Sequence, residues 1–234
     1  MGRLSPERNQ RMRAGYMANI THIDYELGRF MQKLAKLGIL DSTLLIFCSD
    51  HGDMMGDHHL HRKTYAYEGS ARIPFVMRYP CDLQLKSGTF EHVVGLQDIM
   101  PTILEAAGAP IPKTVTGQSV FDAIRGRPWR GHLHGEHSPC YSGDEAMHYL
   151  TDGRSKYIYF PKSGEEQLFD LIGDRQELHD LATDPSRAAE LEIWRRVLVK
   201  LLAKRPDGFS DGEKLLRKEW WSPVAAENVP AGKG

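Results

Sequence analysis

Six side chains suited to cation binding or acid–base chemistry follow one short apolar run in the first quarter of the chain. They are Asp50, His51, His58, His59, His61 and Lys63. A carboxylate and an imidazole that are adjacent in the chain are candidate ligands for a divalent cation. A lysine and a histidine close behind such a pair can neutralise a doubly charged tetrahedral oxyanion and polarise its leaving group. The segment 50–63 is therefore the first candidate for a functional site.

Each of these groups also has a purely structural explanation. Asp50 can cap the turn that follows it, and a histidine-rich loop can simply be solvated. A single lysine such as Lys63 is more often a surface residue than a catalytic one. The functional interpretation is favoured because the groups fall within 14 residues, 50 through 63, between two apolar runs at 43–48 and 73–79.

The elements around the candidate site are predicted from apolar periodicity. Apolar residues at three- and four-residue steps predict an amphipathic helix over 12–37, which Gly38 ends. The nearly unbroken apolar run 43–48 predicts a strand buried on both faces. A helix followed by a buried strand is half of a parallel α/β unit, and ligands gather beyond the carboxyl ends of such strands.

The second half of the chain has a different pattern. A short helix is predicted over 97–107, and the Pro- and Gly-rich residues 109–131 are expected to connect two layers. Turn dipeptides then separate short strand-like pieces, which favours antiparallel hairpins. These pieces are 148–151, 157–160 and 167–171, followed by a helix over 185–203. We therefore expect an α/β fold with a partial parallel sheet in residues 1–130, and a small antiparallel sheet with a C-terminal helix in residues 131–234.

The composition describes an ordinary globular protein. In 234 residues, 30 Lys+Arg and 31 Asp+Glu leave a net charge of -1, so neither a nucleic acid nor a membrane is expected as a partner. No apolar stretch is long enough to span a bilayer, and the first residues do not form a secretory signal, so the compartment stays open. Cys48, Cys81 and Cys140 have no zinc-type spacing, and Trp220-Trp221 are expected to lie back over the body.

Two segments carry a resemblance to a known family. Residues 49–58 (Ser-Asp-His-Gly-Asp-Met-Met-Gly-Asp-His), with Lys63 and residues 67–74, resemble the second signature block of the sulfatases, which belong to the alkaline-phosphatase-like superfamily. Further similar segments extend over nearly the whole chain. They are 23–29, 97–102, 151–158 and 167–171.

The resemblance implies roles for individual residues. Asp50 and His51 match the metal-ligand pair of the family, for which Ca2+ is expected and Mn2+ or Zn2+ are the alternatives. Lys63 matches the lysine that contacts the sulfate and the leaving-group oxygen. His58 matches the histidine often found in this loop and is the second catalytic candidate. His134 and His137, in the segment 132–137, match a substrate-binding segment, although an edge strand with exposed histidines explains them equally well. The implied substrate is a sulfate ester.

One part of the family pattern is missing from this sequence. Sulfatases form a formylglycine nucleophile from a Cys or Ser in a C/S-x-P/A-x-R signature, and no Cys or Ser of this chain stands in that context. The chain resembles only the C-terminal half of a sulfatase, and we expect the formylglycine in the other half. Asp50 and His51 alone cannot fill the six to eight oxygen positions that calcium prefers. We therefore expect the chain by itself to be inactive.

Three other interpretations remain open at this point. The chain could be part of a phosphodiester or phosphonate monoester hydrolase of the same superfamily. It could be a non-catalytic truncated product that associates with another chain through an exposed sheet edge. It could also be an unrelated α/β domain that uses its histidines to bind zinc.

Overall fold

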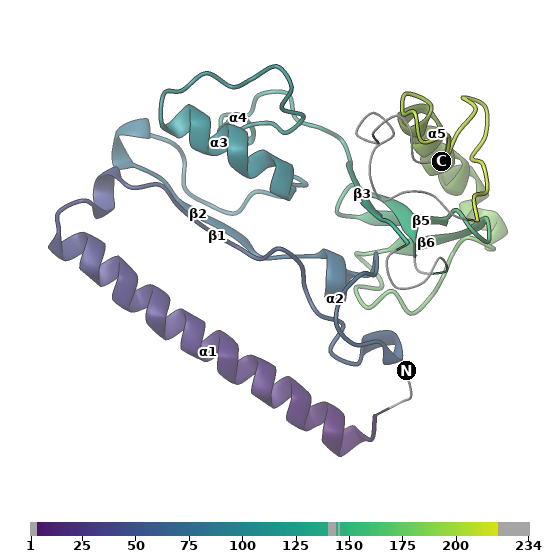
Figure 1. Cartoon of the computed structure of the whole chain (residues 1–234), viewed down its shortest axis with the longest axis horizontal. Coiled ribbons are helices and arrows are strands. Elements are labelled where there is room, and N and C mark those ends of the chain that lie inside the picture. Colours follow the sequence, from purple (N-terminus) through teal and green to yellow (C-terminus); the bar gives the residue numbers. More distant parts are fainter. Residues whose placement is uncertain (1–3, 140–143, 145, 220–234) are drawn as a thin grey trace, which may run out of the picture. The chain divides into compact units, whose positions relative to one another are not determined.

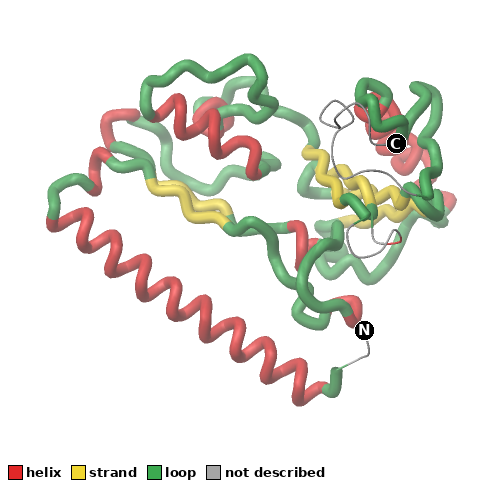
Figure 2. Tube along the Cα trace, in the orientation of Figure 1, coloured by secondary structure: helices red, strands yellow, loops and turns green. Residues whose placement is uncertain are grey.

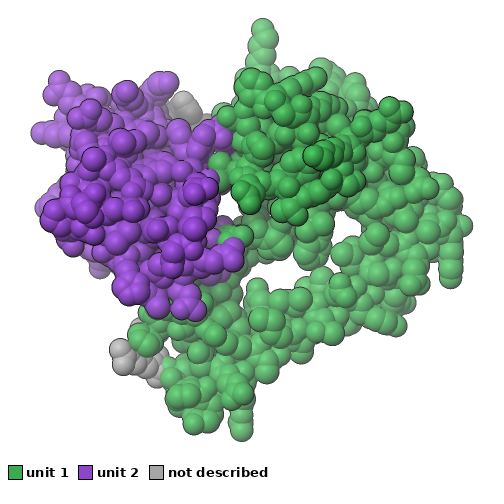
Figure 3. Space-filling model, turned by 180° about the vertical axis from the view of Figure 1, so that it is seen from behind, with its two compact units in different colours: residues 1–63, 72–129 green, residues 64–71, 130–234 purple. Residues whose placement is uncertain are grey.

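The computed structural model describes residues 4–139, 144 and 146–219, which divide into two compact units (Figure 3). The first unit comprises the residues up to Lys63 together with 72–129. The second comprises the short segment 64–71 and the residues from Arg130 onward. Cys140 and the pair Trp220-Trp221 lie outside the described residues.

A single long helix, α1 (Pro6–Lys36), begins the first unit (Figure 1). Ser5 caps its start by accepting a hydrogen bond from Arg8 N (3.4 Å), and Pro6 takes the first helical position, where its missing N–H has no cost. The helix is followed by Gly38 at φ 71°, a conformation that glycine adopts without strain. The predicted helix is thus confirmed and begins six residues earlier than expected. None of its residues 6–36 is buried, and its apolar stripe is exposed or only partly covered.

Strands β1 (Leu45–Cys48) and β2 (Phe75–Arg78) form a two-stranded sheet in the first unit. They pair antiparallel, with Leu45 opposite Arg78, so the expected parallel pairing is wrong for these strands. A parallel pair needs a crossover that is usually helical, and the connection 49–74 contains only short helical turns. The strand β1 is also half-exposed rather than buried on both faces, because one neighbouring strand cannot cover it.

Two short helices complete the first unit beyond the sheet. α3 (Ile99–Ala106) and α4 (Val120–Ile124) are joined where the buried Thr102 hydroxyl accepts a hydrogen bond from Val120 N (2.9 Å). The helix predicted over 97–107 is therefore confirmed. Single 3-10 turns lie at Leu40–Ser42, Asp57–His59, Cys81–Leu83 and Leu96–Asp98.

The second unit is built on a four-stranded antiparallel sheet with the order β3-β4-β5-β6 (Figures 1 and 2). The strands are β3 (Leu133–His137), β4 (Met147–Thr151), β5 (Ser155–Phe160) and β6 (Glu165–Asp170). The helices of this unit are α2 (Glu68–Ala71) and α5 (Ala188–Leu202), the latter preceded by a 3-10 turn at Pro185–Arg187. The antiparallel hairpins and the C-terminal helix expected from the sequence are confirmed.

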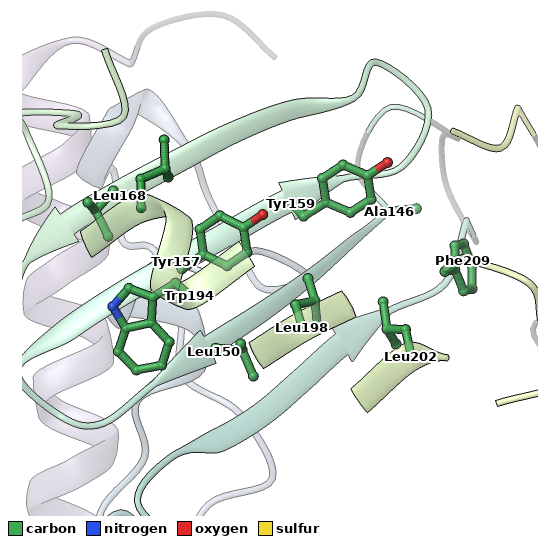
Figure 4. Packing of buried hydrophobic residues seen from close by; sticks show 10 residues of the cluster. Ala146, Leu150, Tyr157, Tyr159, Leu168, Trp194, Leu198, Leu202 and Phe209 are labelled. Atoms are coloured by element: carbon green, nitrogen blue, oxygen red, sulfur yellow. The ribbon is translucent and has the colours of Figure 1, made fainter. Parts of the chain in front are cut away.

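The main hydrophobic core lies between this sheet and α5 (Figure 4). Tyr157 of β5 and Leu168 of β6 pack there with Leu198 and Leu202 of α5, and all four are 0% exposed. The opposite face of the sheet has a smaller core, in which Ile158 and Phe169 pack with Ala66 of the segment 64–71. Because successive strand residues point to opposite faces, β5 is buried on both sides.

The fold class expected from the sequence is confirmed: an α/β chain with a small antiparallel sheet and a C-terminal helix. No helix of the described residues is long and apolar enough to cross a lipid bilayer.

Candidate functional site

The end of β1 brings a carboxylate and an imidazole to the same point. His51 Nδ1 lies 2.7 Å from the Gly52 carbonyl oxygen, which can only accept, so Nδ1 carries the ring hydrogen. His51 Nε2 is then left with a lone pair, and it lies 3.5 Å from Asp50 Oδ2. Asp50 Oδ1 accepts a hydrogen bond from His51 N (3.0 Å), which fixes the carboxylate beside the ring.

The side chain of Lys63 also lies at this pair, although Lys63 is 12 residues beyond His51 in the chain. Its Nζ lies 3.0 Å from His51 Nε2. The loop between them is closed like a narrow hairpin, with hydrogen bonds from Met54 N to Arg62 O (2.7 Å) and from Gly56 N to Leu60 O (2.8 Å). The candidate site residues Asp50, His51 and Lys63 are therefore brought together, as their spacing suggested.

A second carboxylate holds the base of this loop. Asp53 Oδ1 accepts hydrogen bonds from Met55 N (2.9 Å) and from Arg62 N (3.1 Å), so it joins the two ends of the loop just before Lys63. Asp53 is not among the candidate residues from the sequence, although its place within the signature-like block is a usable signal.

The N-terminal part of α1 braces the tip of the loop. Arg13 donates a hydrogen bond to Met55 O (2.9 Å) and forms an ion pair with Asp57 (2.5 Å). Gly56, at φ 94°, lies so close to Asn9 that an added Cβ would stand 2.3 Å from Asn9 Oδ1. Nothing in the sequence pattern pointed to these contacts, because they join residues more than 40 positions apart.

The loop also concentrates unusual backbone conformations. Seven described residues other than glycine have positive φ, and five of them lie between residues 55 and 64. They are Met55, His58, His59, Arg62 and Thr64. Such conformations cost energy and persist where surrounding contacts enforce them, often at functional sites. His58, at φ 52°, lies half-buried within this strained loop.

The pair Asp50–His51 has the geometry of two neighbouring cation ligands. Ligands about 2.3–2.6 Å from an ion and at right angles to one another lie about 3.3–3.7 Å apart, and the observed separation is 3.5 Å. A carboxylate oxygen and an unprotonated imidazole nitrogen also suit a divalent cation chemically. Among the described residues, no third His, Cys, Asp or Glu completes a group of ligands with this pair. The chain thus offers a cation two ligands, and His51 Nε2 would have to exchange its hydrogen bond from Lys63 Nζ for the ion.

His134 and His137 lie on β3 in the second unit. They are three residues apart on a strand, so their side chains leave opposite faces of the sheet. Their expected role in substrate binding stays a prediction.

His134 shares its face of the sheet with two residues that the sequence analysis did not select. Glu136 follows it by two positions, and the strand register places His148 of β4 directly opposite Glu136. His134 Nε2 lies 3.2 Å from His148 Nδ1, which is itself 3.3 Å from Glu136 Oε2. The alternation His-x-Glu was a usable signal, whereas the part played by His148 depends on the strand register.

The charges in this second group are set by its surroundings. Burial, with an electrostatic influence of the neighbouring His148 as a further cause, lowers the pKa of His134 to about 4. Burial alone would raise the pKa of Glu136, but hydrogen bonds from His148 and Arg205 outweigh it and bring the pKa to about 2. At neutral pH His134 is therefore uncharged and Glu136 is ionised.

Solved structures with the same fold identify the class of protein. A 2-O GAG sulfatase matches 97% of this chain and 52% of its own with a TM-score of 0.80, at 20% identity. The phosphonate monoester hydrolase of Agrobacterium radiobacter matches 79% of this chain and 40% of its own with a TM-score of 0.68, at 29% identity. The fold is thus that of the alkaline-phosphatase-like hydrolases.

The sequence comparisons then give the family. The family model described as Sulfatase matches residues 3–109. An arylsulfatase of Clostridium perfringens is 43% identical over 212 residues, which are 89% of this chain and 44% of the relative. The chain belongs to the sulfatase family, as its motifs indicated. It spans less than half the length of the curated relatives that it matches.

Proposed function

We propose that this chain supplies the cation-binding and leaving-group side of a metal-dependent hydrolase of sulfate esters. In this proposal Asp50 and His51 hold the cation, which is Ca2+, with Mn2+ or Zn2+ as the alternatives. The bound cation supplies Lewis-acid stabilisation of the ester oxygens. Lys63 stabilises the negative charge that develops on the bridging oxygen, and His58 is a further group on the same loop.

The observation that carries this proposal is the position of Lys63 Nζ, 3.0 Å from the same His51 nitrogen that faces Asp50 Oδ2. Lys63 Nζ donates to the single lone pair of His51 Nε2, so a cation bound there would displace this hydrogen bond. The displaced ammonium would stay beside the cation, and the two positive charges would repel one another. A bound anion that contacts both of them removes this repulsion. The arrangement therefore favours an anionic substrate group such as a sulfate ester.

The test joins this chain to the part of the Clostridium perfringens arylsulfatase that it does not match. The joined protein is expected to hydrolyse an aryl sulfate. Lys63→Ala should lower the turnover by about 10²–10³-fold, as the loss of other preorganised oxyanion donors does. Lys33→Ala, on the exposed surface of α1, is the matched control and should leave turnover unchanged. Equal rates for Lys63→Ala and the parent protein would rule out the role of Lys63.

The metal assignment is tested with the same joined protein. Asp50→Ala removes one of the two ligands offered by this chain, so bound Ca2+ and turnover should fall together. The bound metal is counted by elemental analysis after gel filtration. An Asp50→Ala protein with an unchanged metal content would overturn the assignment.

A second candidate function is phosphonate monoester hydrolysis, because a hydrolase of that class shares this fold at 29% identity. The two functions are separated by assaying the joined protein with an aryl sulfate and an aryl phosphonate monoester of the same leaving group. A faster reaction with the phosphonate would favour the second candidate.

A further inference from the structure

The face of the β3–β4 ladder that lies toward α5 carries three cation-ligating side chains. His134 and Glu136 are two positions apart on β3, so both point to this face. The antiparallel register places His148 of β4 opposite Glu136 and diagonal to His134. All three residues belong to the second unit, and none belongs to the loop that carries Asp50 and Lys63.

The three side chains present their ligand atoms to a common point. One nitrogen from each histidine and a carboxylate oxygen of Glu136 all lie within 4.8 Å of one another. The two separations that involve His148 Nδ1 are 3.2 Å to His134 Nε2 and 3.3 Å to Glu136 Oε2. Ligands of a tetrahedral Zn2+ ion, at bond lengths of about 2.0–2.1 Å, lie about 3.3–3.4 Å apart.

Hydrogen bonds between these groups satisfy them poorly. The atoms His134 Nε2 and Glu136 Oε2 both face His148 Nδ1, which can offer them only a single hydrogen. Glu136 Oε2 already accepts a hydrogen bond from Arg205 (2.6 Å), and the two contacts of His148 Nδ1, at 3.2 and 3.3 Å, lie at or beyond the long end of the normal hydrogen-bond range. His148 is 2% exposed, and its other nitrogen, Nε2, is buried with no hydrogen-bond partner among the described residues. Nε2 is not one of the three ligand atoms, and it carries the ring hydrogen when Nδ1 binds an ion.

We propose that His134 Nε2, His148 Nδ1 and the Glu136 carboxylate form a zinc site in the second unit, with one further position open to water. Two imidazoles and one carboxylate are a recurrent ligand set for Zn2+. A cation accepts all three lone pairs at once, which the single shared hydrogen cannot do. The site opens to solvent beside Glu136, whose side chain is 42% exposed, whereas that of His148 is 3% exposed.

One neighbour opposes the ion and thereby offers a control. Arg205, just beyond α5, donates a hydrogen bond to Glu136 Oε2 (2.6 Å) and brings a positive charge to the edge of the site. Its removal breaks the same ion pair that the loss of Glu136 breaks, but it leaves all three ligands in place. Zn2+ binding should therefore be retained when Arg205 is replaced and weakened when Glu136 is replaced.

The test uses the purified 234-residue chain with Asp50→Ala and His51→Ala, so that the loop cannot hold an ion. The protein is stripped with a chelator and titrated with Zn2+ in competition with a chromogenic chelator. One equivalent should bind, and Co2+ in its place should give the visible absorption of a tetrahedral ion. Glu136→Gln or His134→Gln should weaken binding at least about 100-fold, the upper limit for residues that only support a ligand. The Arg205→Gln variant should bind Zn2+ as tightly as the parent protein or more tightly.

Three results would overturn the proposal. In the first, the parent protein, which carries Asp50→Ala and His51→Ala, binds no Zn2+. In the second, Glu136→Gln binds Zn2+ as tightly as the parent. In the third, Arg205→Gln weakens Zn2+ binding as much as Glu136→Gln does. The last result would mean that the ion pair, rather than ligation, accounts for the effect of Glu136. Circular dichroism of each variant shows whether the sheet is retained, and His134→Gln gives a second ligand change that leaves the Arg205–Glu136 pair intact.

Discussion

Lys156 of β5 donates a hydrogen bond from Nζ to Glu177 Oε1 (2.8 Å), and the side chains of both residues are 1% exposed. The same ammonium reaches Glu68 Oε1 at 2.8 Å, and Glu177 Oε2 accepts from Glu68 N at 2.6 Å. Burial raises the pKa of Glu177, against the opposing effect of the Lys156 charge. This buried network fixes the segment 64–71, which begins at the residue after Lys63.

Lys156→Met should strongly destabilise the protein. The change leaves Glu177 buried without its cation, which typically costs about 3–5 kcal/mol. Equilibrium unfolding in urea measures the loss. Lys162→Met is the matched control, because Lys162 and its partner Asp144 are exposed and such pairs contribute little. Similar destabilisation by both substitutions would mean that the buried network has no special role.

Gly56→Ala should disturb the loop that carries Lys63. A residue with a side chain is strained at φ 94°, and its Cβ would collide with Asn9, so a loss of about 1–2 kcal/mol or more is expected. Hydrogen exchange of residues 54–62 should become faster at the same time. Gly15→Ala, in the exposed helix α1 with nothing within 4 Å of the added Cβ, should instead stabilise slightly. Unchanged exchange in Gly56→Ala would contradict the bracing of the loop by α1.

The chain by itself should not hydrolyse an aryl sulfate or an aryl phosphate in the presence of Ca2+, Mn2+ or Zn2+. Asp50 and His51 offer two ligands, which would leave most of the coordination shell of an ion to bulk water, and the sequence contains no nucleophile in the activating context. A steady-state assay of the purified chain measures this directly. Metal-dependent turnover that disappears with Asp50→Ala would show that this chain is self-sufficient.

The first unit should promote association of the purified chain. Large apolar side chains are exposed on α1 and on the two-stranded sheet, including Ile20 at 47%, Phe30 at 51% and Val76 at 61%. Sedimentation velocity over a range of concentrations should reveal species larger than the monomer. Val76→Lys, on the sheet, should reduce association, because a charged residue on an edge strand opposes pairing. Ile193→Lys, equally exposed on α5 at 62%, should have a smaller effect.

The sequence predicted the local elements well, and it placed His51 and Lys63 close together. The helix α1 and the hairpins of the second unit follow from periodicity and turn residues, which act over a few positions. The closeness of His51 and Lys63 follows from their short separation within one loop. The antiparallel pairing of β1 with β2 did not follow, because pairing direction depends on the path of the whole connection.

Long-range partners escaped prediction for a related reason. Arg13 and Asp57 are 44 residues apart, and no periodicity links them. His148 reaches Glu136 only through the register of β3 and β4, in which a shift by one residue would turn one of them to the other face. Such contacts depend on tertiary structure, which the local pattern does not contain.

The segment 64–71 has a consequence for how this protein can be divided. A gene fragment that begins at Arg130 would encode all four strands and α5, yet it would omit Glu68 and the buried Ala66. Lys156 would lose one of its two carboxylates, and Ile158 and Phe169 would lose a packing neighbour. The second unit is therefore a discontinuous module, and recombination at residue 130 would transfer it incomplete.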